Sequence, residues 1–192
     1  MRIACCIPVY LSSDVLFDFT KQTIESIQSE NNEVSIYVIV NFSKPEYYPK
    51  KDTFKLHESI KNFKVIDNPK GNHVSSSWNY GVKLALEDKN DFAIVMNNDV
   101  VCHKKCIDNL ATFADMNPKF LLWTASEWID IRTLDGVKEA NIEWTFDEHP
   151  HFSFFMVNQK TIDTVGWFNE DLQMAYHEDG LYHYKILVTG NK

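Results

Sequence analysis

The most constraining feature of this sequence is the run VSIYVIV at residues 34–40, which is almost entirely apolar and rich in β-branched side chains. A strand with one face in solvent alternates apolar and polar residues, whereas a run of this kind is typical of a strand covered on both faces. Similar short runs occur at 3–9, 63–68 and 92–96. We therefore expect these strands to form a sheet that is flanked by helices.

Predicted helices separate these strands along the chain. They lie at 14–30, at about 52–62, from Val74 onward and at 103–116, and in most of them apolar residues recur at helical spacing. Strand and helix thus alternate through the first half. This alternation predicts an α/β fold with a mostly parallel central sheet and right-handed crossovers.

The second half of the sequence has a different pattern, which predicts mixed structure. Its expected elements are a β-hairpin turning at LDG (134–136), a strand at 152–157, a short helix ending at Gly166, and a helix or a turn leading into one at 177–188. No low-complexity linker interrupts the chain. We therefore expect a single domain over residues 1–192.

Composition excludes several classes of protein. The chain has 192 residues, of which 44% are hydrophobic, so it can bury a core. Its formal net charge is -8 and no run of Lys or Arg is present, which argues against a nucleic-acid backbone as partner. No stretch approaches the roughly 18 to 20 apolar residues of a membrane-spanning helix. We expect a cytoplasmic protein without a transmembrane segment, and self-association is left open.

The four cysteines predict buried thiols in a reducing compartment. Cys5 and Cys6 are adjacent, so on a strand they face opposite sides. Cys102 and Cys106 lie within CHKKC, which supplies too few ligands at the spacing usual for zinc.

Polar side chains gather where the predicted strands end. Three of these ends are Tyr10 after the first strand, Asn41 after the second and Asn68 after the third, and the fourth strand runs directly into Asn97, Asn98 and Asp99. Asn and Asp also favour turns and helix caps, so a capped helix start at 97–103 is the alternative explanation. In open α/β sheets, however, ligands bind outside the carboxyl ends of the strands. The coincidence of polar ends therefore predicts a binding site at this edge.

The order of these motifs resembles glycosyltransferases of the GT-A fold, most closely the large inverting group called family 2. The matching stretches are IPVY, VIVNFS, NPKGNHVSSSWNYGVKLA, FAIVMNNDV, FSFFMVNQKTIDTVGWFNEDL and HED. The resemblance implies transfer of a sugar from a nucleotide-diphosphate donor to an acceptor hydroxyl, with inversion. Residues 1–100 would bind the donor, expected to be a UDP-sugar, and residues 101–192 the acceptor, a glycan, a lipid-linked group or another hydroxyl.

The resemblance assigns the donor and its metal ion to the strand ends. Asp99 occupies the place of the family's metal-binding aspartate, where Mn²⁺ or Mg²⁺ neutralises the charge on the departing diphosphate. The remaining donor contacts implied by the resemblance are Pro8, Tyr10 and Asn41 for the nucleoside, Asn72 and Asn79 near the diphosphate, and Asn97 and Asn98 beside the metal. Gly81, in the same helix as Asn79, permits close approach either of the diphosphate or of another element of the fold.

Asp179 matches the aspartate that serves the family as catalytic base, within the motif HED at 177–179. Inverting transfer needs a base that takes the proton of the acceptor hydroxyl. The alternative is that Glu178 and Asp179 are first-turn acids at a helix N-terminus.

Two rival functions remain at this stage. One is a non-catalytic nucleotide-sugar-binding or scaffold domain, and the other is a nucleotidyltransferase, which would need cations for a triphosphate. Relatives often supply a late histidine to the metal, beyond the point where this sequence ends. The resemblance therefore leaves open a C-terminally short chain or a metal site formed by Asp99 and the donor alone.

Overall fold

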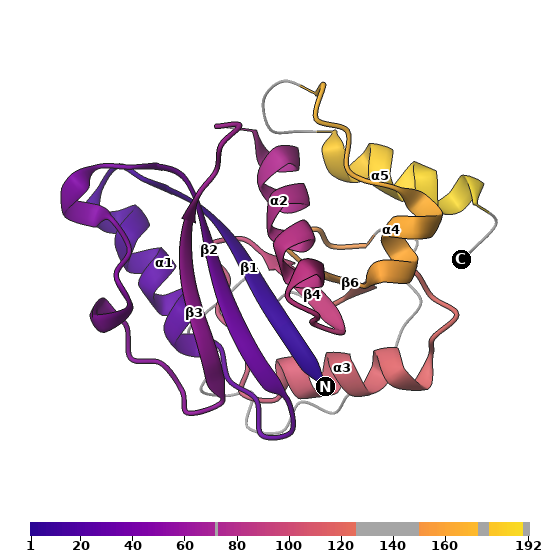
Figure 1. Cartoon of the computed structure of the whole chain (residues 1–192), viewed down its shortest axis with the longest axis horizontal. Helices are drawn as coiled ribbons and strands as arrows, with labels where there is room; N and C mark the ends of the chain where they lie inside the picture. Colours follow the sequence, from indigo (N-terminus) through magenta and orange to yellow (C-terminus); the bar gives the residue numbers. More distant parts are fainter. Residues whose placement is uncertain (72, 126–149, 173–176, 190–192) are drawn as a thin grey trace.

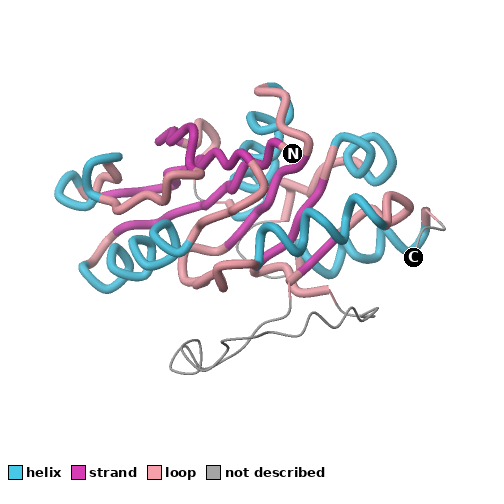
Figure 2. Tube along the Cα trace, turned by 90° about the horizontal axis from the view of Figure 1, so that it is seen from below, coloured by secondary structure: helices cyan, strands magenta, loops and turns pink. Residues whose placement is uncertain are grey.

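The computed structural model describes residues 1–71, 73–125, 150–172 and 177–189, and these form a sheet with helices on both sides (Figures 1 and 2). The strands are β1 (Arg2–Leu11), β2 (Glu33–Ser43), β3 (Ile60–Asp67), β4 (Phe92–Met96), β5 (Trp123–Thr124) and β6 (Phe154–Val157). The helices are α1 (Asp14–Ser26), α2 (Val74–Glu87), α3 (Cys106–Met116), α4 (Gln159–Val165) and α5 (Glu178–Val188), with 3-10 turns η1 (Pro45–Tyr47) and η2 (Lys51–Thr53). The hairpin predicted at 134–136 lies outside the described residues.

The six described strands follow the order β3-β2-β1-β4-β6-β5. β1 pairs in parallel with β2 and β4, and β2 pairs in parallel with β3. β6 runs antiparallel to both β4 and β5. The predicted α/β fold is thus confirmed, with a parallel first half and a mixed second half.

The core has two layers because the central strands β1, β2 and β4 are buried on both faces. On β1, Ile3, Cys5 and Ile7 face a cluster that includes residues of α1 and α3. Ala4 and Cys6 face the opposite cluster, which includes residues of α2, α4 and α5. The apolar runs of β1, β2 and β4 therefore reflect cover on both faces, whereas β3, at the edge of the sheet, is half-exposed along its length.

The helix predicted at about 52–62 is wrong. Only the short turn η2 forms there, and β3 begins at Ile60. Phe54 enters the core beside Phe63, with ring centroids 5.5 Å apart. The Nδ1 atom of His57 accepts a hydrogen bond from the Ser59 backbone N–H at 3.2 Å. Such local side-chain-to-backbone bonds compete with helix formation, and the sequence pattern does not reveal them.

The cysteines are free thiols, as predicted. Cys5, Cys6 and Cys102 are buried, and Cys106 is partly buried. None of the helices in the described ranges is long and apolar enough to cross a membrane.

Gly81 allows α2 to lie directly on β1. A Cβ atom at this position would lie 2.8 Å from the Cβ of Cys6 and 3.2 Å from its Sγ. Carbon atoms do not approach this closely without displacement, and a Cβ on a central strand cannot rotate away. The glycine is therefore explained by helix–sheet packing, one of the two alternatives that the sequence left open.

We predict that Gly81→Ala lowers the free energy of unfolding by about 1–3 kcal/mol, because the added methyl group overpacks the contact with Cys6. Urea unfolding measures this change. Gly180→Ala is the control, since a Cβ there meets nothing within 4 Å and no loss of stability is expected. Equal stability of the two variants would contradict the packing argument.

Asp108 on α3 forms hydrogen bonds with the turn between α1 and β2. Its buried carboxylate accepts hydrogen bonds from the Ser29 hydroxyl, the backbone N–H of Glu30 at 2.8 Å and the Asn32 amide at 2.7 Å. Burial raises the pKa of Asp108, but these hydrogen bonds outweigh it and hold the pKa below its ordinary value. The ionised form is therefore stabilised in the folded state.

We predict that Asp108 contributes stability above its unfolded-state pKa and loses this contribution as the pH falls through the lower folded-state pKa. Asp108→Asn should therefore be less stable at neutral pH and lose less stability than wild type on acidification. Thermal unfolding from pH 7 to pH 3 measures both effects. The exposed Asp115 on the same helix provides the control Asp115→Asn, which should retain the wild-type pH profile.

Candidate functional site

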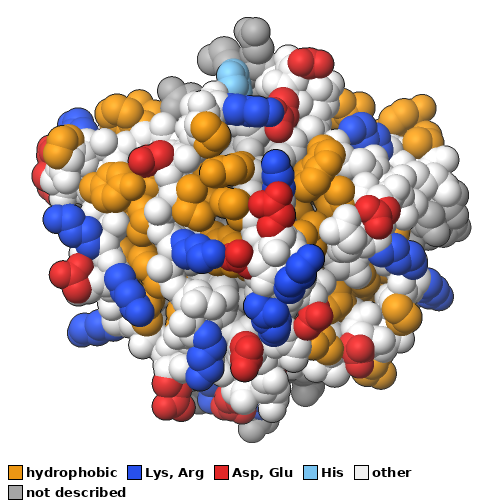
Figure 3. Space-filling model, viewed as in Figure 1, with side chains coloured by type: hydrophobic (Ala, Val, Ile, Leu, Met, Phe, Trp, Pro, Cys, Tyr) orange, Lys and Arg blue, Asp and Glu red, His pale blue; other side chains and the backbone are white. Residues whose placement is uncertain are grey.

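The carboxyl ends of β1 to β4 and the N-terminal ends of α2 and α5 lie at one edge of the molecule (Figure 1). This arrangement follows from parallel pairing, because parallel strands end at the same edge. On the face that Figure 3 shows, basic and acidic side chains are interspersed.

Asn41 is held by side chains from α2 and from the loop after β3. Its Oδ1 accepts hydrogen bonds from the Ser77 hydroxyl at 2.7 Å and from Asn68 Nδ2 at 2.9 Å. Asn68 is buried, and its Oδ1 accepts the backbone N–H of Lys70 at 3.1 Å. These contacts orient the Asn41 carboxamide through its Oδ1.

An exposed aromatic pair lies beside Asn41. Tyr10 and Phe42 stack with ring centroids 4.9 Å apart and an interplanar angle of 29°. They are 48% and 41% exposed, which is unusual for adjacent large rings that a core could bury. Pro8 is half-buried within β1. Sequence reasoning did not select Phe42, although its position directly after Asn41 was the available signal.

The loop that carries Asp99 is fixed to α1. The amide of Asn98 donates a hydrogen bond to the Thr20 hydroxyl at 2.9 Å, and the backbone N–H of Cys102 donates to Ser26 Oγ at 3.0 Å. Asp99 lies between these two anchors and is exposed. The half-buried Asn97 continues the pairing of β4 through a backbone bond to the Ser153 carbonyl at 2.8 Å.

Asp179 lies in the first turn of α5 and is exposed. Its Oδ1 accepts the backbone N–H of Gly180 at 2.7 Å. Its neighbour Glu178 is buried. His177, which precedes the helix, has a φ of 84°, a left-handed conformation that is uncommon for a residue with a side chain. This backbone turn sets the direction in which α5 begins.

Asn79 is turned toward the segment between α4 and α5. It is 7% exposed, and its Nδ2 lies 2.9 Å both from the Phe168 carbonyl and from Glu170 Oε1. Lys70 forms an ion pair with the same carboxylate. Burial raises the pKa of Glu170, but the hydrogen bonds from Asn79 and Lys70 outweigh it and keep the pKa below its ordinary value. Asn72 lies outside the described residues.

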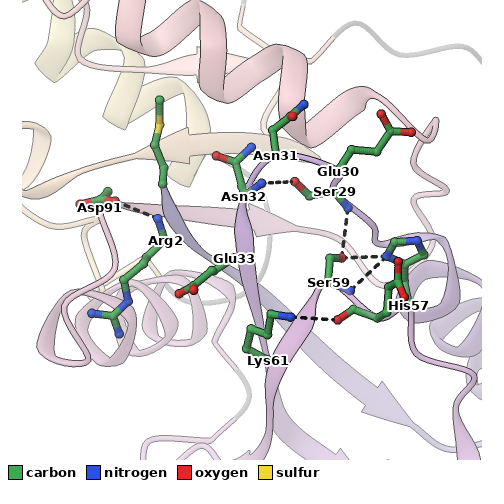
Figure 4. A pocket seen from close by; sticks show the side chains of 12 residues that line it. Arg2, Ser29, Glu30, Asn31, Asn32, Glu33, His57, Ser59, Lys61 and Asp91 are labelled. Atoms are coloured by element: carbon green, nitrogen blue, oxygen red, sulfur yellow. Dashed lines mark hydrogen bonds between the residues drawn. The ribbon is translucent and has the colours of Figure 1, made fainter.

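The cavities in the described part of the chain include one at the carboxyl edge of the sheet and one at its amino edge. The smaller, about 330 Å³, lies between α2 and the segment 166–172 and is lined by Lys70, Tyr80, Trp167 and Glu170, among others. The larger, about 810 Å³, lies at the opposite edge of the sheet. Figure 4 shows it at the amino ends of the strands, lined by residues such as Arg2, Glu33, Ser59, Lys61 and Asp91.

The side chains at the carboxyl edge suit a hard divalent cation that takes most of its oxygen ligands from a bound diphosphate rather than from the protein. The described residues contain no cluster of three or more His, Cys, Asp or Glu side chains that could bind a metal by itself. Asp99 nevertheless offers an exposed carboxylate two residues after the half-buried Asn97, and oxygen ligands are those that Mn²⁺ and Mg²⁺ prefer. A site of this kind requires further oxygens from a bound diphosphate.

We predict that Thr20→Val destabilises the fold by about 1–2 kcal/mol, because it removes the hydroxyl that accepts from Asn98 and donates to the Leu16 carbonyl. Urea unfolding measures the change. Thr23→Val is the matched control on the same helix, since the buried Thr23 hydroxyl has no hydrogen-bond partner among the described residues. Equal stability of Thr20→Val and wild type would mean that this bond does not hold the Asp99 loop.

Comparison with known proteins identifies the family. The profile of Glycosyl transferase family 2 matches residues 4–175. No curated protein matches the chain significantly. The structure is similar to the mannosyltransferase PcManGT from Pyrobaculum calidifontis, solved in complex with GDP-Man and Mn²⁺, with a TM-score of 0.64 and 12% identity over 100% of this chain and 53% of that one.

A second similar structure is that of TarS residues 1–349 from S. aureus, with a TM-score of 0.62 and 17% identity over 96% of this chain and 55% of that one. The chain thus spans about half the length of both solved structures. At these identities the likeness establishes the fold, which is GT-A, while the profile covers most of the sequence. The chain therefore belongs to glycosyl transferase family 2.

Proposed function

We propose that this chain transfers a sugar from a nucleotide-diphosphate donor to an acceptor hydroxyl, with inversion and with the help of a divalent cation. The observation that supports the proposal is that the strand ends carrying the Tyr10–Phe42 pair, Asn41 and Asp99 lie at the same edge of the molecule as the start of α5, which carries Asp179 (Figure 1). Membership of glycosyl transferase family 2 supports the reaction class.

The nucleoside would bind at the ends of β1 and β2. A base can stack on the exposed rings of Tyr10 and Phe42, which already lie together. Asn41 keeps its Oδ1 for Ser77 and Asn68, so its Nδ2 is the group that meets the base. We therefore propose that Asn41 donates a hydrogen bond to a carbonyl oxygen of the base, as in uracil.

Asp99 would hold Mn²⁺ or Mg²⁺ together with Asn97 and the diphosphate oxygens. When bound, the cation would neutralise the negative charge on the leaving diphosphate. The bonds of Asn98 to Thr20 and of Cys102 to Ser26 keep the loop in one position before the donor arrives. The solved PcManGT complex with GDP-Man and Mn²⁺ supports this type of cofactor in a protein of similar fold.

Asp179 would act as the base. Its carboxylate takes the proton of the acceptor hydroxyl as that oxygen attacks the anomeric carbon and the bond to the diphosphate oxygen breaks. The Gly180 N–H donates a hydrogen bond to Oδ1 of Asp179 and so orients this carboxylate in the first turn of α5. The base and the leaving group would then lie on opposite faces of the sugar, which is the geometry of inversion.

We further propose the division of labour implied by the sequence, with donor binding in residues 1–100 and acceptor binding in 101–192. The acceptor would be a glycan, a lipid-linked group or another hydroxyl compound, and the reaction would take place in the cytoplasm. UDP-sugars are the donors to test first, because uracil presents carbonyl oxygens to the Asn41 amide.

We predict that wild-type protein with Mn²⁺ slowly hydrolyses at least one sugar in a panel of UDP-, GDP-, dTDP- and CMP-sugars, and that Asp99→Ala abolishes this hydrolysis. Released nucleotide measures the reaction. Asp179→Asn should retain the Mn²⁺-dependent rise in melting temperature caused by the donor, but lose transfer to an acceptor. Asp115→Asn, which changes an exposed aspartate on α3, should match wild type in both assays.

The outcomes separate the candidate functions. Nucleotide binding without hydrolysis of any donor would overturn the enzymatic proposal in favour of a nucleotide-sugar-binding domain. Loss of donor binding in Asp179→Asn would show that Asp179 belongs to the donor site and is not the base.

A further inference from the structure

Asn79 contacts the backbone of Phe168 in both directions. Its Nδ2 donates to the Phe168 carbonyl at 2.9 Å, and the Phe168 N–H donates to its Oδ1 at 3.0 Å. The side chain thus pairs with one residue of the α4–α5 segment much as a neighbouring strand would. A third contact, to Glu170 Oε1 at 2.9 Å, extends the attachment by two residues. Both polar atoms of the buried Asn79 amide thus have partners within the protein, although the sequence assigned this residue to the nucleotide-sugar donor.

Phe168 transmits this attachment to α5. Its ring stacks on that of Tyr182, with centroids 3.8 Å apart and an interplanar angle of 13°, and both rings are buried. Tyr182 follows Asp179 by three positions, so the two residues are neighbours one turn apart on the helix. The position of the Phe168 ring therefore determines where the first turn of α5 lies.

Two hydrogen bonds fix α5 to the same segment. The Tyr182 hydroxyl donates to the Gly166 carbonyl at 3.1 Å, and Lys185 Nζ donates to the Trp167 carbonyl at 2.8 Å. The helix is thus held at consecutive points by residues 166–168. That segment is held in turn by Asn79 on α2, which is itself fixed on β1 through Gly81.

We infer that Asn79 is a positioning residue for the base rather than a ligand of the donor, acting through Phe168 and Tyr182 on the N-terminal turn of α5. The inference rests on the proposed role of Asp179. An acceptor hydroxyl must be aligned with the anomeric carbon, and a displacement of about 1 Å in such a geometry can cost on the order of 100-fold in rate. Asn79 sets that alignment without touching substrate.

The test compares two buried asparagines, Asn79 within α2 and Asn90 in the segment that follows the helix. Asn79→Ala leaves the N–H and C=O groups of Phe168 without the side chain that pairs with them. Asn90→Ala is the matched control: Asn90 is also 7% exposed, and its Nδ2 donates to the Ala85 carbonyl at 2.8 Å. Both variants should lower the melting temperature. Only Asn79→Ala should reduce the kcat of transfer, by at least 10-fold, while the KM for the donor stays within two-fold of wild type.

A second pair of variants tests the path through Tyr182. Tyr182→Phe keeps the stacked ring and loses only the bond to Gly166, so its kcat should stay closer to wild type than that of Tyr182→Leu, which loses the stack. Combining Tyr182→Leu with Asn79→Ala should reduce kcat by much less than the product of the two single effects, because both changes release the same helix. Independent, multiplicative effects would overturn the proposed path.

The remaining outcomes distinguish this inference from the proposed function. A raised donor KM with unchanged kcat in Asn79→Ala would overturn the inference and leave the glycosyltransferase proposal intact. If wild type is inactive with every donor, the proposed function fails, and amide hydrogen exchange still tests the attachment. Asn79→Ala should then exchange at least 10-fold faster than wild type at residues 179–182, and Asn90→Ala should not. Equal exchange in both variants would overturn the attachment.

Discussion

The parallel pairing of β1 with both β2 and β4 is the constraint on which the rest of the structure depends. Parallel strands need crossover connections, and here these are supplied by α1 on one face of the sheet and α2 on the other. The same pairing brings the strand ends to one edge. The aromatic pair, Asn41 and the Asp99 loop come from segments far apart in the sequence, and they become neighbours because their strands share a direction.

The helix α2 connects the two halves of this arrangement. Its inner face lies against β1, where a side chain at position 81 would collide with Cys6. Its N-terminal turns reach outward on two sides, through Ser77 to Asn41 and through Asn79 to Phe168. Asn41 and the segment at Phe168 are thus both attached to the same helix. Their separation is set by the packing of that helix rather than by the loops that carry them.

Hydrogen bonding divides the asparagines of the site into two kinds. The amides of Asn79 and Asn98 are directed to protein partners and stabilise segments that carry aspartates. Asn41 instead accepts hydrogen bonds at its Oδ1 from Ser77 and Asn68. A residue type that looks uniform in the sequence therefore attaches other segments in two places and is itself held by neighbouring side chains in a third. A buried amide that lacks a hydrogen-bond partner destabilises the fold by more than a single hydrogen bond stabilises it. Each of these amides therefore requires the partner that it has.

The sequence alone determined the strand–helix alternation, the parallel sheet and the family, because buried β-branched runs and the Asn-Asn-Asp strand end are local patterns. It failed at residues 52–62, where the burial of Phe54 and side-chain bonds to the backbone override a helix. Only the tertiary structure decided that Asn79 faces Phe168 and that Phe42 joins Tyr10. The direction and partners of a side chain depend on elements distant in sequence, and no local pattern encodes which atoms they will meet.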